Sequence, residues 1–301
     1  MPHGSTRKTR SARLLRWLRR TVTLKELRKR RAERDRVKHE MGEIAKFPKN
    51  ANAPRHGLPG ELIVSLTSYP ARFKTLHLTI KALLDQKVKP DRVILWIDRH
   101  DMRKVPKAVR ELEGPAFSIL TGQDVRSFNK IVPALIAFPN SFIVVADDDL
   151  YYPDNWLQGL VEAYDPGQPT IVYHRGHRLA HSADGSLAPY RAWQHEVTDP
   201  ESLIPGTGIM PTGVGGVLYP PGSLPPKAVD IGLIRQLSET CDDSWLYFMW
   251  RQTAWTAKRV PGEGFRIVDW PQSQQHSLRK FHRGGMKDEH LRALSDYFGT
   301  P

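Results

Sequence analysis

The most constraining feature of the sequence is a short apolar run that ends in three consecutive aspartates. Residues 142–146 read FIVVA, without a formal charge and mostly with β-branched or aromatic side chains, and Asp147, Asp148 and Asp149 follow directly. Such a run predicts a buried β-strand that opens into a loop of carboxylates. Because alternate side chains of an extended chain share a face, Asp147 and Asp149 are expected to point one way and Asp148 the other.

This loop has the composition of a metal site. Two carboxylates about 5 Å apart repel by roughly 3 kcal/mol at an effective dielectric near 20, so a cation is expected between Asp147 and Asp149. Oxygen ligands on a short span suit a hard divalent ion such as Mg²⁺ or Mn²⁺, with waters or phosphate oxygens as its other ligands. The alternative is that the acidic run caps a helix opened by Pro153.

The charge of the chain is concentrated in its first 50 residues. They hold 17 Lys and Arg against 5 Asp and Glu, a net charge of +12, whereas the whole chain carries +13. The single cysteine, Cys241, excludes an intrachain disulfide and fits a reducing compartment. No apolar run approaches the roughly 18 residues that span a bilayer, and arginines interrupt the N-terminal leucines. We therefore expect a cytoplasmic protein, free or peripheral on the inner face of the membrane.

The pattern divides the chain into three parts: a basic helical extension over residues 1–50, a linker over 51–60 and a main domain over 61–301. The extension is consistent with a basic amphipathic helix on an anionic membrane, a nucleic-acid arm or a solvated helix. Leucines and Trp17 on one side, with arginines on the other, favour the membrane and make nucleic acid the least favoured partner.

Strand and helix patterns alternate through the first half of the main domain. Strands are expected at 62–66, 92–97, 117–120 and 142–146, with helices between them. This alternation argues for an α/β fold with right-handed βαβ units and a mainly parallel sheet. Further on, the patterns predict a strand at 170–174, a hairpin that turns at Asp184-Gly185, an irregular Gly/Pro-rich region at 205–226, a buried helix at 245–255, a last strand at 265–270 and a helix near 291–298.

Polar side chains from four loops are expected to meet at one edge of this sheet, since ligands bind at the carboxyl ends of parallel strands. They belong to the Thr67, Ser68 and Arg72 loop, to Asp98, to the Arg126, Asn129 and Lys130 loop, and to the aspartate triplet. Together they would hold an anionic ligand bridged by a metal. Asp98 alone is equally consistent with a helix cap or a turn.

A second acidic pair, Asp242 and Asp243, stands at the start of the predicted buried helix. Acids in this position often serve as caps that interact with the helix dipole. In a chain that already holds a carboxylate metal site, a general base is the alternative. Glycines at 213, 215 and 216 would let backbone approach a ligand closely, although the region lacks the Gly-Lys-Ser/Thr ending of a P-loop.

Five segments, taken in order, resemble a known enzyme family. They are SLTSYPAR (65–72), FNKIVPAL (128–135), VADDDLYYPDNWL (145–157), GGVLYPP (215–221) and CDDSWL (241–246). The set resembles the nucleotide-sugar-dependent glycosyltransferases of the GT-A type, of the bacterial polysaccharide or glycan kind, over residues 60–300. The resemblance implies a GT-A, Rossmann-like sheet flanked by helices, a divalent metal (Mn²⁺ or Mg²⁺) and a nucleotide-sugar donor.

The resemblance also implies roles for individual residues. Asp147 and Asp149 correspond to an Asp-x-Asp pair, with Asp149 as the direct metal ligand and Asp147 also toward the ribose or sugar. A histidine late in the chain would be another metal ligand, with His276 preferred over His282. The remaining implied roles are a uridine pocket at Thr67, Ser68, Arg72 and Asp98, a diphosphate contact at Lys130, a sugar and acceptor cleft at Gly215 and Gly216, and a catalytic base at Asp243 or Asp242.

The implied reaction is the transfer of a sugar, with a UDP-sugar favoured, to a hydroxyl of a glycan or lipid-linked acceptor. The metal would neutralise the diphosphate leaving group, and a carboxylate would take the acceptor proton in one inverting displacement. Two alternatives remain: a two-metal phosphohydrolase or nuclease, and a non-catalytic module tethered to a membrane or to RNA. The nearly neutral main domain argues against the nuclease.

Overall fold

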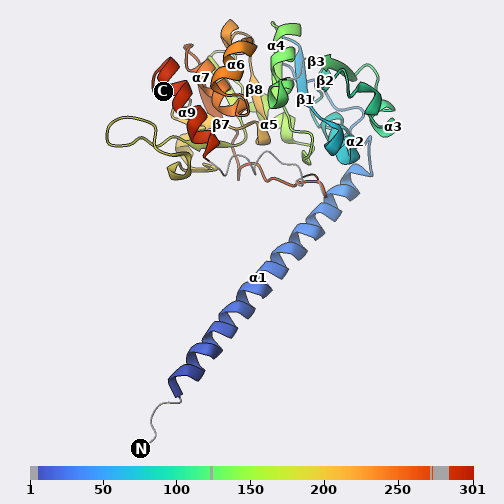
Figure 1. The fold of residues 1–301 in the computed structure, drawn as a ribbon. Coiled ribbons are helices and arrows are strands. Elements are labelled where there is room, and N and C mark those ends of the chain that lie inside the picture. Colours follow the sequence, from blue (N-terminus) through green and yellow to red (C-terminus); the bar gives the residue numbers. More distant parts are fainter. Residues whose placement is uncertain (1–5, 123–124, 272, 274–284) are drawn as a thin grey trace, which may run out of the picture. The chain divides into compact units, whose positions relative to one another are not determined.

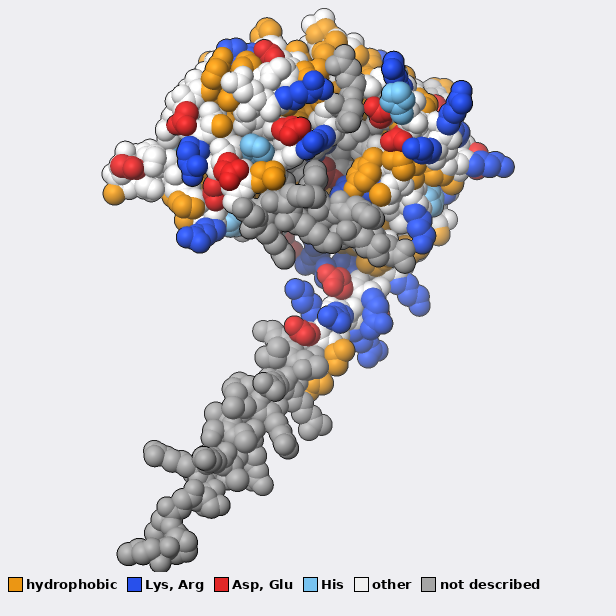
Figure 2. All heavy atoms as spheres, viewed as in Figure 1, with side chains coloured by type: hydrophobic (Ala, Val, Ile, Leu, Met, Phe, Trp, Pro, Cys, Tyr) orange, Lys and Arg blue, Asp and Glu red, His pale blue; other side chains and the backbone are white. Residues whose placement is uncertain are grey.

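The computed structural model describes residues 6–122, 125–271, 273 and 285–301, with side chains from Leu24 onward except Lys25. It divides into two compact units, Met1–Ala45 and Lys46–Pro301, and each is described by itself. The first unit contains helix α1 (Thr6–Ile44), which lies within the helical extension expected over residues 1–50 (Figure 1). Lys and Arg side chains crowd its described part (Figure 2), where Leu24 and Leu27 are also exposed. None of the described helices is both long enough and apolar enough to cross a membrane.

The second unit is built on a seven-stranded sheet with the strand order β3-β2-β1-β4-β8-β5-β9. Strand β8 runs antiparallel to its neighbours β4 and β5, while the other neighbouring pairs are parallel. The predicted α/β fold with a mainly parallel sheet is therefore confirmed. The strands of this sheet are β1 (Leu62–Thr67), β2 (Arg92–Asp98), β3 (Phe117–Gly122), β4 (Phe142–Val145), β5 (Thr170–Tyr173), β8 (Val217–Tyr219) and β9 (Thr256–Arg259).

Helices cover both faces of this sheet (Figure 1). They are α2 (Phe73–Leu84), α3 (Lys107–Arg110), α4 (Val132–Ala137), α5 (Trp156–Ala163), α6 (Ile231–Leu237), α7 (Asp242–Trp250) and α9 (Met286–Phe298), with short 3₁₀ turns that include η1 (Pro70–Arg72) and η3 (Arg126–Lys130). Alternate strand residues such as Ile63, Ile143 and Tyr173 form one core cluster with buried residues of η3, α4, α6, α7 and α9. Each such fully buried apolar side chain contributes about 1.5–3 kcal/mol.

The strand register brings the predicted site loops to one edge of the sheet. Ser65 of β1 pairs with Val145 of β4, so the loops that begin after both strands leave the sheet at the same level. Val145 also pairs with Val217, the first residue of the antiparallel β8. The Gly-rich segment that precedes β8 therefore arrives at the edge where the aspartate triplet begins.

One predicted element near the C-terminal end of the domain is wrong, and another ends earlier than expected. Residues 265–270 make only an isolated bridge, between Leu150 and Asp269, and the last strand among the described residues is β9. The apolar pattern there reflects packing on the aspartate loop, because Trp270 is buried and its amide donates to the Asp149 carbonyl. The predicted helix at 245–255 ends at Trp250, where the Thr253 hydroxyl donates to the Trp250 carbonyl in a tight turn.

The predicted hairpin between residues 178 and 193 is present in an irregular form, with its turn at the expected place. Gly185 has a φ of +82°, and the Asp184 carboxylate accepts from the Ser186 amide. Only isolated bridges flank this turn, whereas β6 (Gly176–Arg178) pairs instead with β7 (Ile209–Pro211). The arms of the turn thus keep isolated antiparallel bridges, Arg178 with Gln194 and His181 with Leu187, while the regular pairing is the longer-range one.

Candidate active site

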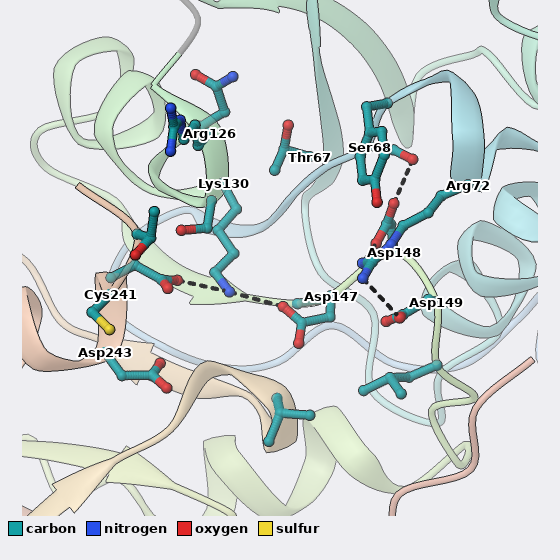
Figure 3. Close-up of a pocket in the computed structure, with 18 of the residues that line it drawn as sticks. Thr67, Ser68, Arg72, Arg126, Lys130, Asp147, Asp148, Asp149, Cys241 and Asp243 are labelled. Atoms are coloured by element: carbon teal, nitrogen blue, oxygen red, sulfur yellow. Dashed lines mark hydrogen bonds and ion pairs between the residues drawn. The ribbon is translucent and has the colours of Figure 1, made fainter. Parts of the chain in front are cut away.

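A cavity of about 1200 Å³ opens at the carboxyl edge of the parallel strands (Figure 3). Its walls come from the loops after β1, β2 and β4, from η3, from residues 190–196 and 240–243, and from α9. The structure brings most of the predicted site residues to this cavity: Thr67, Ser68, Arg72, Asp98, Lys130, Asp147, Asp149, Asp242 and Asp243.

Asp148, the middle aspartate, anchors the loop that follows β1. The Ser68 hydroxyl donates to Asp148 Oδ2 at 2.5 Å, and Arg72 Nη1 donates to Asp148 Oδ1 at 2.6 Å. Burial raises the pKa of Asp148 despite these partners, since its side chain is only 3% exposed. Burial alone would lower the pKa of Arg72, but Asp148 and Asp149 raise it, so the guanidinium stays charged. Asp148 thus positions two residues that were expected to bind the donor.

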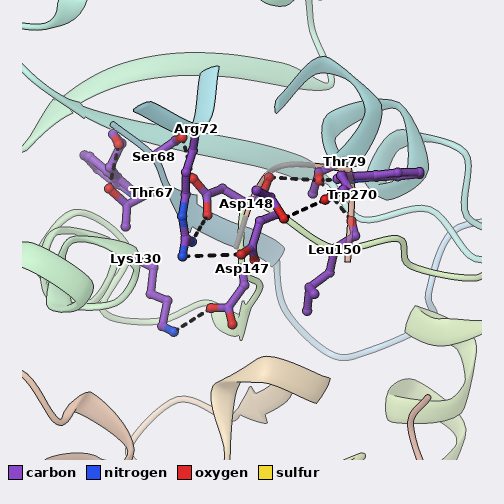
Figure 4. A network of polar contacts seen from close by, with 12 residues as sticks. Thr67, Ser68, Arg72, Thr79, Lys130, Asp147, Asp148, Leu150 and Trp270 are labelled. Carbon is purple, nitrogen blue, oxygen red and sulfur yellow. Dashed lines mark hydrogen bonds and ion pairs between the residues drawn. The ribbon is translucent and has the colours of Figure 1, made fainter. Parts of the chain in front are cut away.

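Thr79 of α2 fixes the backbone of the aspartate loop through hydrogen bonds. Thr79 Oγ1 lies 3.0 Å from the Asp148 carbonyl oxygen and 2.9 Å from that of Leu150, and it accepts from Trp270 Nε1 at 2.8 Å (Figure 4). These groups are buried, so their hydrogen bonds avoid the cost of unpaired polar atoms. The loop therefore presents its carboxylates from a rigid base.

Lys130 joins the two acidic stretches of the sequence. Its Nζ lies 2.8 Å from Asp147 Oδ1 and 2.8 Å from Asp242 Oδ2, and the residue is 7% exposed (Figure 3). Burial by itself would lower the pKa of the Lys130 amine, but Asp147, Asp242 and Asp243 outweigh it and raise that pKa well above its usual range. The amine is therefore a fixed positive charge in the wall of the cavity.

Asp149 lies where negative charge is most crowded. Burial and the carboxylates of Asp148, Asp147 and Asp269 raise the pKa of Asp149 to about 7, although Arg72 Nη2 at 3.3 Å opposes them. Figure 3 shows Asp147 and Asp149 entering the same part of the cavity. A divalent cation would relieve this crowding, and Mg²⁺ or Mn²⁺ commonly takes one or two carboxylates plus phosphate oxygens. The donor set of this loop fits such an ion.

The described residues supply no complete set of protein ligands. Within these ranges, no group of three or more His, Cys, Asp or Glu side chains is arranged to hold a metal. The predicted histidine ligands, His276 and His282, lie outside the described residues. If the described residues alone hold it, a cation between Asp147 and Asp149 takes its other ligands from substrate oxygens or water.

Asp243 is held by a contact outside its own helix. Its Oδ1 accepts from the Gly213 amide at 2.8 Å, across 30 positions of sequence, while the N-cap residue of α7 is Cys241. By contrast, Asp230 accepts from the Leu233 amide and caps α6. Capping therefore does not account for the contact of Asp243. The capping alternative is wrong for the aspartate triplet, because Asn155 is the N-cap residue of α5.

Gly215 and Gly216 are used for packing. Gly216 has a φ of +93°, and a Cβ there would lie 2.5 Å from the Trp156 ring. The Gly215 carbonyl accepts from Trp156 Nε1 at 2.7 Å, and a Cβ on Gly215 would lie 2.9 Å from Arg175 Cβ. Among the described residues that line the cavity, this segment contributes Val214 and neither glycine. The expected cleft at these glycines is therefore replaced by a tight contact with α5.

Sequence reasoning gave no individual role to several residues that line the cavity, among them Asp148, Arg175, Tyr190 and Lys287. The sequence did contain a signal for Asp148. This residue follows a buried strand and was expected to point away from Asp147 and Asp149, and a buried carboxylate needs a hydrogen-bond donor. Lys287 in the first turn of α9 and Tyr190 in an irregular loop carry no local pattern that marks them.

No protein-family model and no curated protein matches this chain. Among solved structures, it is similar to a 4-diphosphocytidyl-2C-methyl-D-erythritol synthase from Anaerococcus prevotii, with 13% identity, a TM-score of 0.44, and 79% of this chain and 96% of that one covered. It is also similar to a glucosyl-3-phosphoglycerate synthase from Mycobacterium tuberculosis bound to Mn²⁺, UDP and glucosyl-3-phosphoglycerate, with 16% identity, a TM-score of 0.39 and 81% of both chains covered. An inositol-1-phosphate CTP transferase from T. maritima has 8% identity and a TM-score of 0.38, with 80% of this chain and 98% of that one covered. Likenesses at this level do not specify an activity for this chain.

Proposed function

We propose that this chain transfers a sugar from a nucleotide-sugar donor, with a UDP-sugar favoured, to a hydroxyl of a glycan or lipid-linked acceptor. One observation carries the proposal. The crowded carboxylates Asp147 and Asp149 share a single cavity with Asp242 and Asp243, and Lys130 bridges the two groups. A cation site next to a held carboxylate is the arrangement that a metal-assisted displacement with a general base requires.

The donor would lie along the loops that follow β1 and β2. The Thr67 hydroxyl donates to the Trp96 carbonyl at 2.9 Å, and Ser68 and Arg72 are held by Asp148, so this wall is rigid before substrate arrives. Asp98 lines the same side, with its Oδ1 accepting from the His100 amide. Asp147 and Asp149 would hold Mn²⁺ or Mg²⁺, which supplies charge neutralisation to the diphosphate leaving group.

Asp243 is the better placed of the two candidate bases. Asp242 is committed to Lys130, and although burial raises the pKa of Asp242, that ion pair opposes proton uptake. The Gly213 amide orients Asp243 through one carboxylate oxygen. In the proposed step, Asp243 takes the proton of the acceptor hydroxyl, and the acceptor oxygen bonds to the anomeric carbon. The bond from that carbon to the diphosphate breaks on the opposite face, which inverts the configuration.

Screening nucleotide sugars with and without Mn²⁺ tests this proposal. A ligand at 100 times its dissociation constant stabilises a protein by about 2.7 kcal/mol, so a matching UDP-sugar with Mn²⁺ should raise the melting temperature measurably. Incubation with acceptor glycans should then release UDP and yield a glycosylated product by mass spectrometry. Cleavage of phosphodiesters without sugar transfer would favour the phosphohydrolase, and binding without turnover the non-catalytic module.

The basic helix α1 would bring this activity to an anionic membrane. Its described part exposes cations together with Leu24 and Leu27, and each Lys or Arg near an anionic surface adds about 1 kcal/mol. Full-length protein should co-sediment with phosphatidylglycerol vesicles, whereas a chain starting near Ala53 should not. Equal sedimentation of the two forms, or salt-dependent binding of the full-length form to RNA, would contradict this assignment.

A further inference from the structure

We propose that the acceptor carries an anionic group, a carboxylate, phosphate or sulfate, and that Lys287 binds it beside Tyr190. The inference deepens the proposed function, since it names the chemical class of the acceptor. It concerns the part of the cavity formed by Arg175, Tyr190, Arg191 and Lys287, which we call the cationic end.

Lys287 is buried without a carboxylate partner among the described residues. It is 8% exposed and lines the cavity from the first turn of α9. Its Nζ lies over the Tyr190 ring, 4.1 Å from the centroid, and no described Asp or Glu forms an ion pair with it. The neighbours that the structure gives this amine, the Tyr190 ring and hydroxyl, carry no formal charge to balance it, and both the lost hydration and the dipole of α9 oppose a buried cation at this helix start. An incoming anion would supply the missing charge.

Three other buried or half-buried cations of the cavity are already matched. Lys130 contacts two carboxylates, Asp147 and Asp242, and Arg72 likewise contacts Asp148 and Asp149. Arg175 pairs with Glu196 at 2.7 Å. Among the described cations that line this cavity, buried Lys287 is therefore the one whose charge a ligand would have to balance. Exposed Arg191 adds a second positive charge at the rim.

The position of Lys287 assigns it to the acceptor side of the cavity. Tyr190, Lys287 and Asp243 line the same cavity, and Lys287 Nζ lies over the Tyr190 ring. Arg175 Nη1 donates to the Thr212 hydroxyl at 2.9 Å, and the next residue, Gly213, holds Asp243 through its amide. The acceptor hydroxyl must reach Asp243 for its proton to be taken. We therefore assign to the acceptor the groups on the side of Asp243 that faces away from Lys130.

Tyr190 is fixed as a flat surface beside this amine. Its ring packs edge to face with Trp193, His195 and His177, at centroid distances of 4.8–5.7 Å. Its amide donates to Asp288 Oδ1 at 2.7 Å, which ties the loop to α9. An acidic substituent that reaches the Lys287 amine would therefore lie beside a fixed aromatic ring.

The test is equilibrium binding of matched probes to the full chain saturated with UDP and Mn²⁺. The probes are p-nitrophenyl β-glucuronide and p-nitrophenyl β-glucoside, which differ by one carboxylate, together with the 6-phosphate and the 6-sulfate of the glucoside. We expect at least one anionic probe to bind about 10- to 100-fold more tightly than the neutral glucoside, as a charge-assisted hydrogen bond predicts. Which anion binds best distinguishes the three chemistries.

Variants locate this preference. Lys287→Gln should remove it and Lys287→Arg should retain most of it, with unchanged affinity for UDP and Mn²⁺ in both. Lys227→Gln is the matched control, because Lys227 also lies over aromatic rings, those of Tyr297 and Phe298, but outside the residues that line the cavity. If Lys287→Gln fails to fold, the exposed Arg191→Gln should still lower the preference by about threefold.

Two results would overturn the inference: no anionic probe binds more tightly than the glucoside, or Lys287→Gln weakens UDP binding as much as probe binding, which would place the amine at the donor. Because these are binding measurements, they stand apart from turnover. Tight anion binding without sugar transfer would refute the proposed function and keep the anion site. Sugar transfer without a preference for anionic probes would support the proposed function and refute the anion site.

Discussion

The two ends of the cavity balance their buried charges in opposite ways. At the carboxylate end, formed by Asp147, Asp148 and Asp149 with Arg72 and Lys130, each cation meets two carboxylates and negative charge remains in excess. At the cationic end, Lys287 meets an aromatic ring and no described carboxylate. The same protein thus leaves one end short of positive charge and the other short of negative charge.

The opposite charge balance of the two ends can make the site selective before substrate arrives. Excess carboxylate in a low-dielectric wall favours a divalent cation, and an unmatched amine favours an anion. Asp243 lies where the two ends meet, held by the Gly213 amide. A metal-bound donor and an anionic acceptor would therefore be drawn to opposite sides of the proposed base.

The largest effect should come from Asp149→Asn. Loss of the proposed metal ligand should lower turnover by at least about 10³-fold, because the leaving group would lose its charge neutralisation. Stability should change little, since the substitution removes a carboxylate that its neighbours crowd. Initial rates over a Mn²⁺ titration, together with urea unfolding, check both statements. Asp165→Asn, which lies outside the cavity lining, should behave as wild type. Normal Mn²⁺-dependent turnover in Asp149→Asn would end the metal assignment.

Asp243→Asn should lower kcat by roughly 10²- to 10⁴-fold with nearly unchanged donor affinity, as expected when a general base is lost. The amide oxygen can still accept from the Gly213 amide, so the fold should persist. Asp230→Asn is the matched control, because this acid also starts a helix but serves only as its cap. Steady-state kinetics of the two variants decide the matter, and equal activities would reduce Asp243 to a structural residue.

The sequence predicted the carboxylate end far better than the cationic end. Asp147 ends an apolar run, Lys130 lies in a polar loop before a helix, and Asp243 stands at the start of a predicted buried helix. The carboxyl edge of a parallel sheet gathers such segments in one place. The fold class followed from the same alternation. These signals are local, so a single sequence contains them.

The cationic end depends on contacts that no local pattern encodes. Tyr190 and Lys287 are 97 positions apart and meet where the loop of Tyr190 is tied to the first turn of α9 by the bond from the Tyr190 amide to Asp288. Two predictions failed for a related reason. The apolar residues at 265–270 pack on the aspartate loop instead of extending the sheet, and Gly216 accommodates the Trp156 ring. Tertiary packing used these residues in a way that their periodicity could not show.

Removing one cation at each end should sharpen the comparison. Arg72→Met should lower the free energy of unfolding by about 3–5 kcal/mol, because it leaves buried Asp148 without its guanidinium. Lys287→Met should change it by less than about 1 kcal/mol or raise it, since no described carboxylate loses a partner. Urea unfolding of both variants without ligands measures the difference. Equal losses would show that Lys287 already has a structural partner, and the contrast between the ends would disappear.

The smallest effect concerns His177, which is buried at the cationic end with its Nδ1 accepting from the Glu196 amide at 2.9 Å. Burial, Arg175, Lys287 and His195 lower the pKa of His177 to about 2. Between about pH 3 and 6.5 the unfolded chain therefore binds a proton that the folded chain excludes. The free energy of unfolding should therefore rise with pH across this window, and His177 should contribute up to roughly 1.4 kcal/mol per pH unit to that rise. This stabilisation is lost as the pH falls.

Urea unfolding at several pH values can isolate this contribution. His174, whose pKa burial lowers to about 4, adds a slope of the same sign, so the informative quantity is the difference between wild type and His177→Asn. That variant should have the shallower dependence, whereas His181→Asn, at an exposed position, should match wild type. Identical slopes for wild type and His177→Asn would mean that the folded cationic end accepts the proton. Burial and the positive charges of Arg175 and Lys287 would then be too weak to keep the His177 imidazole neutral.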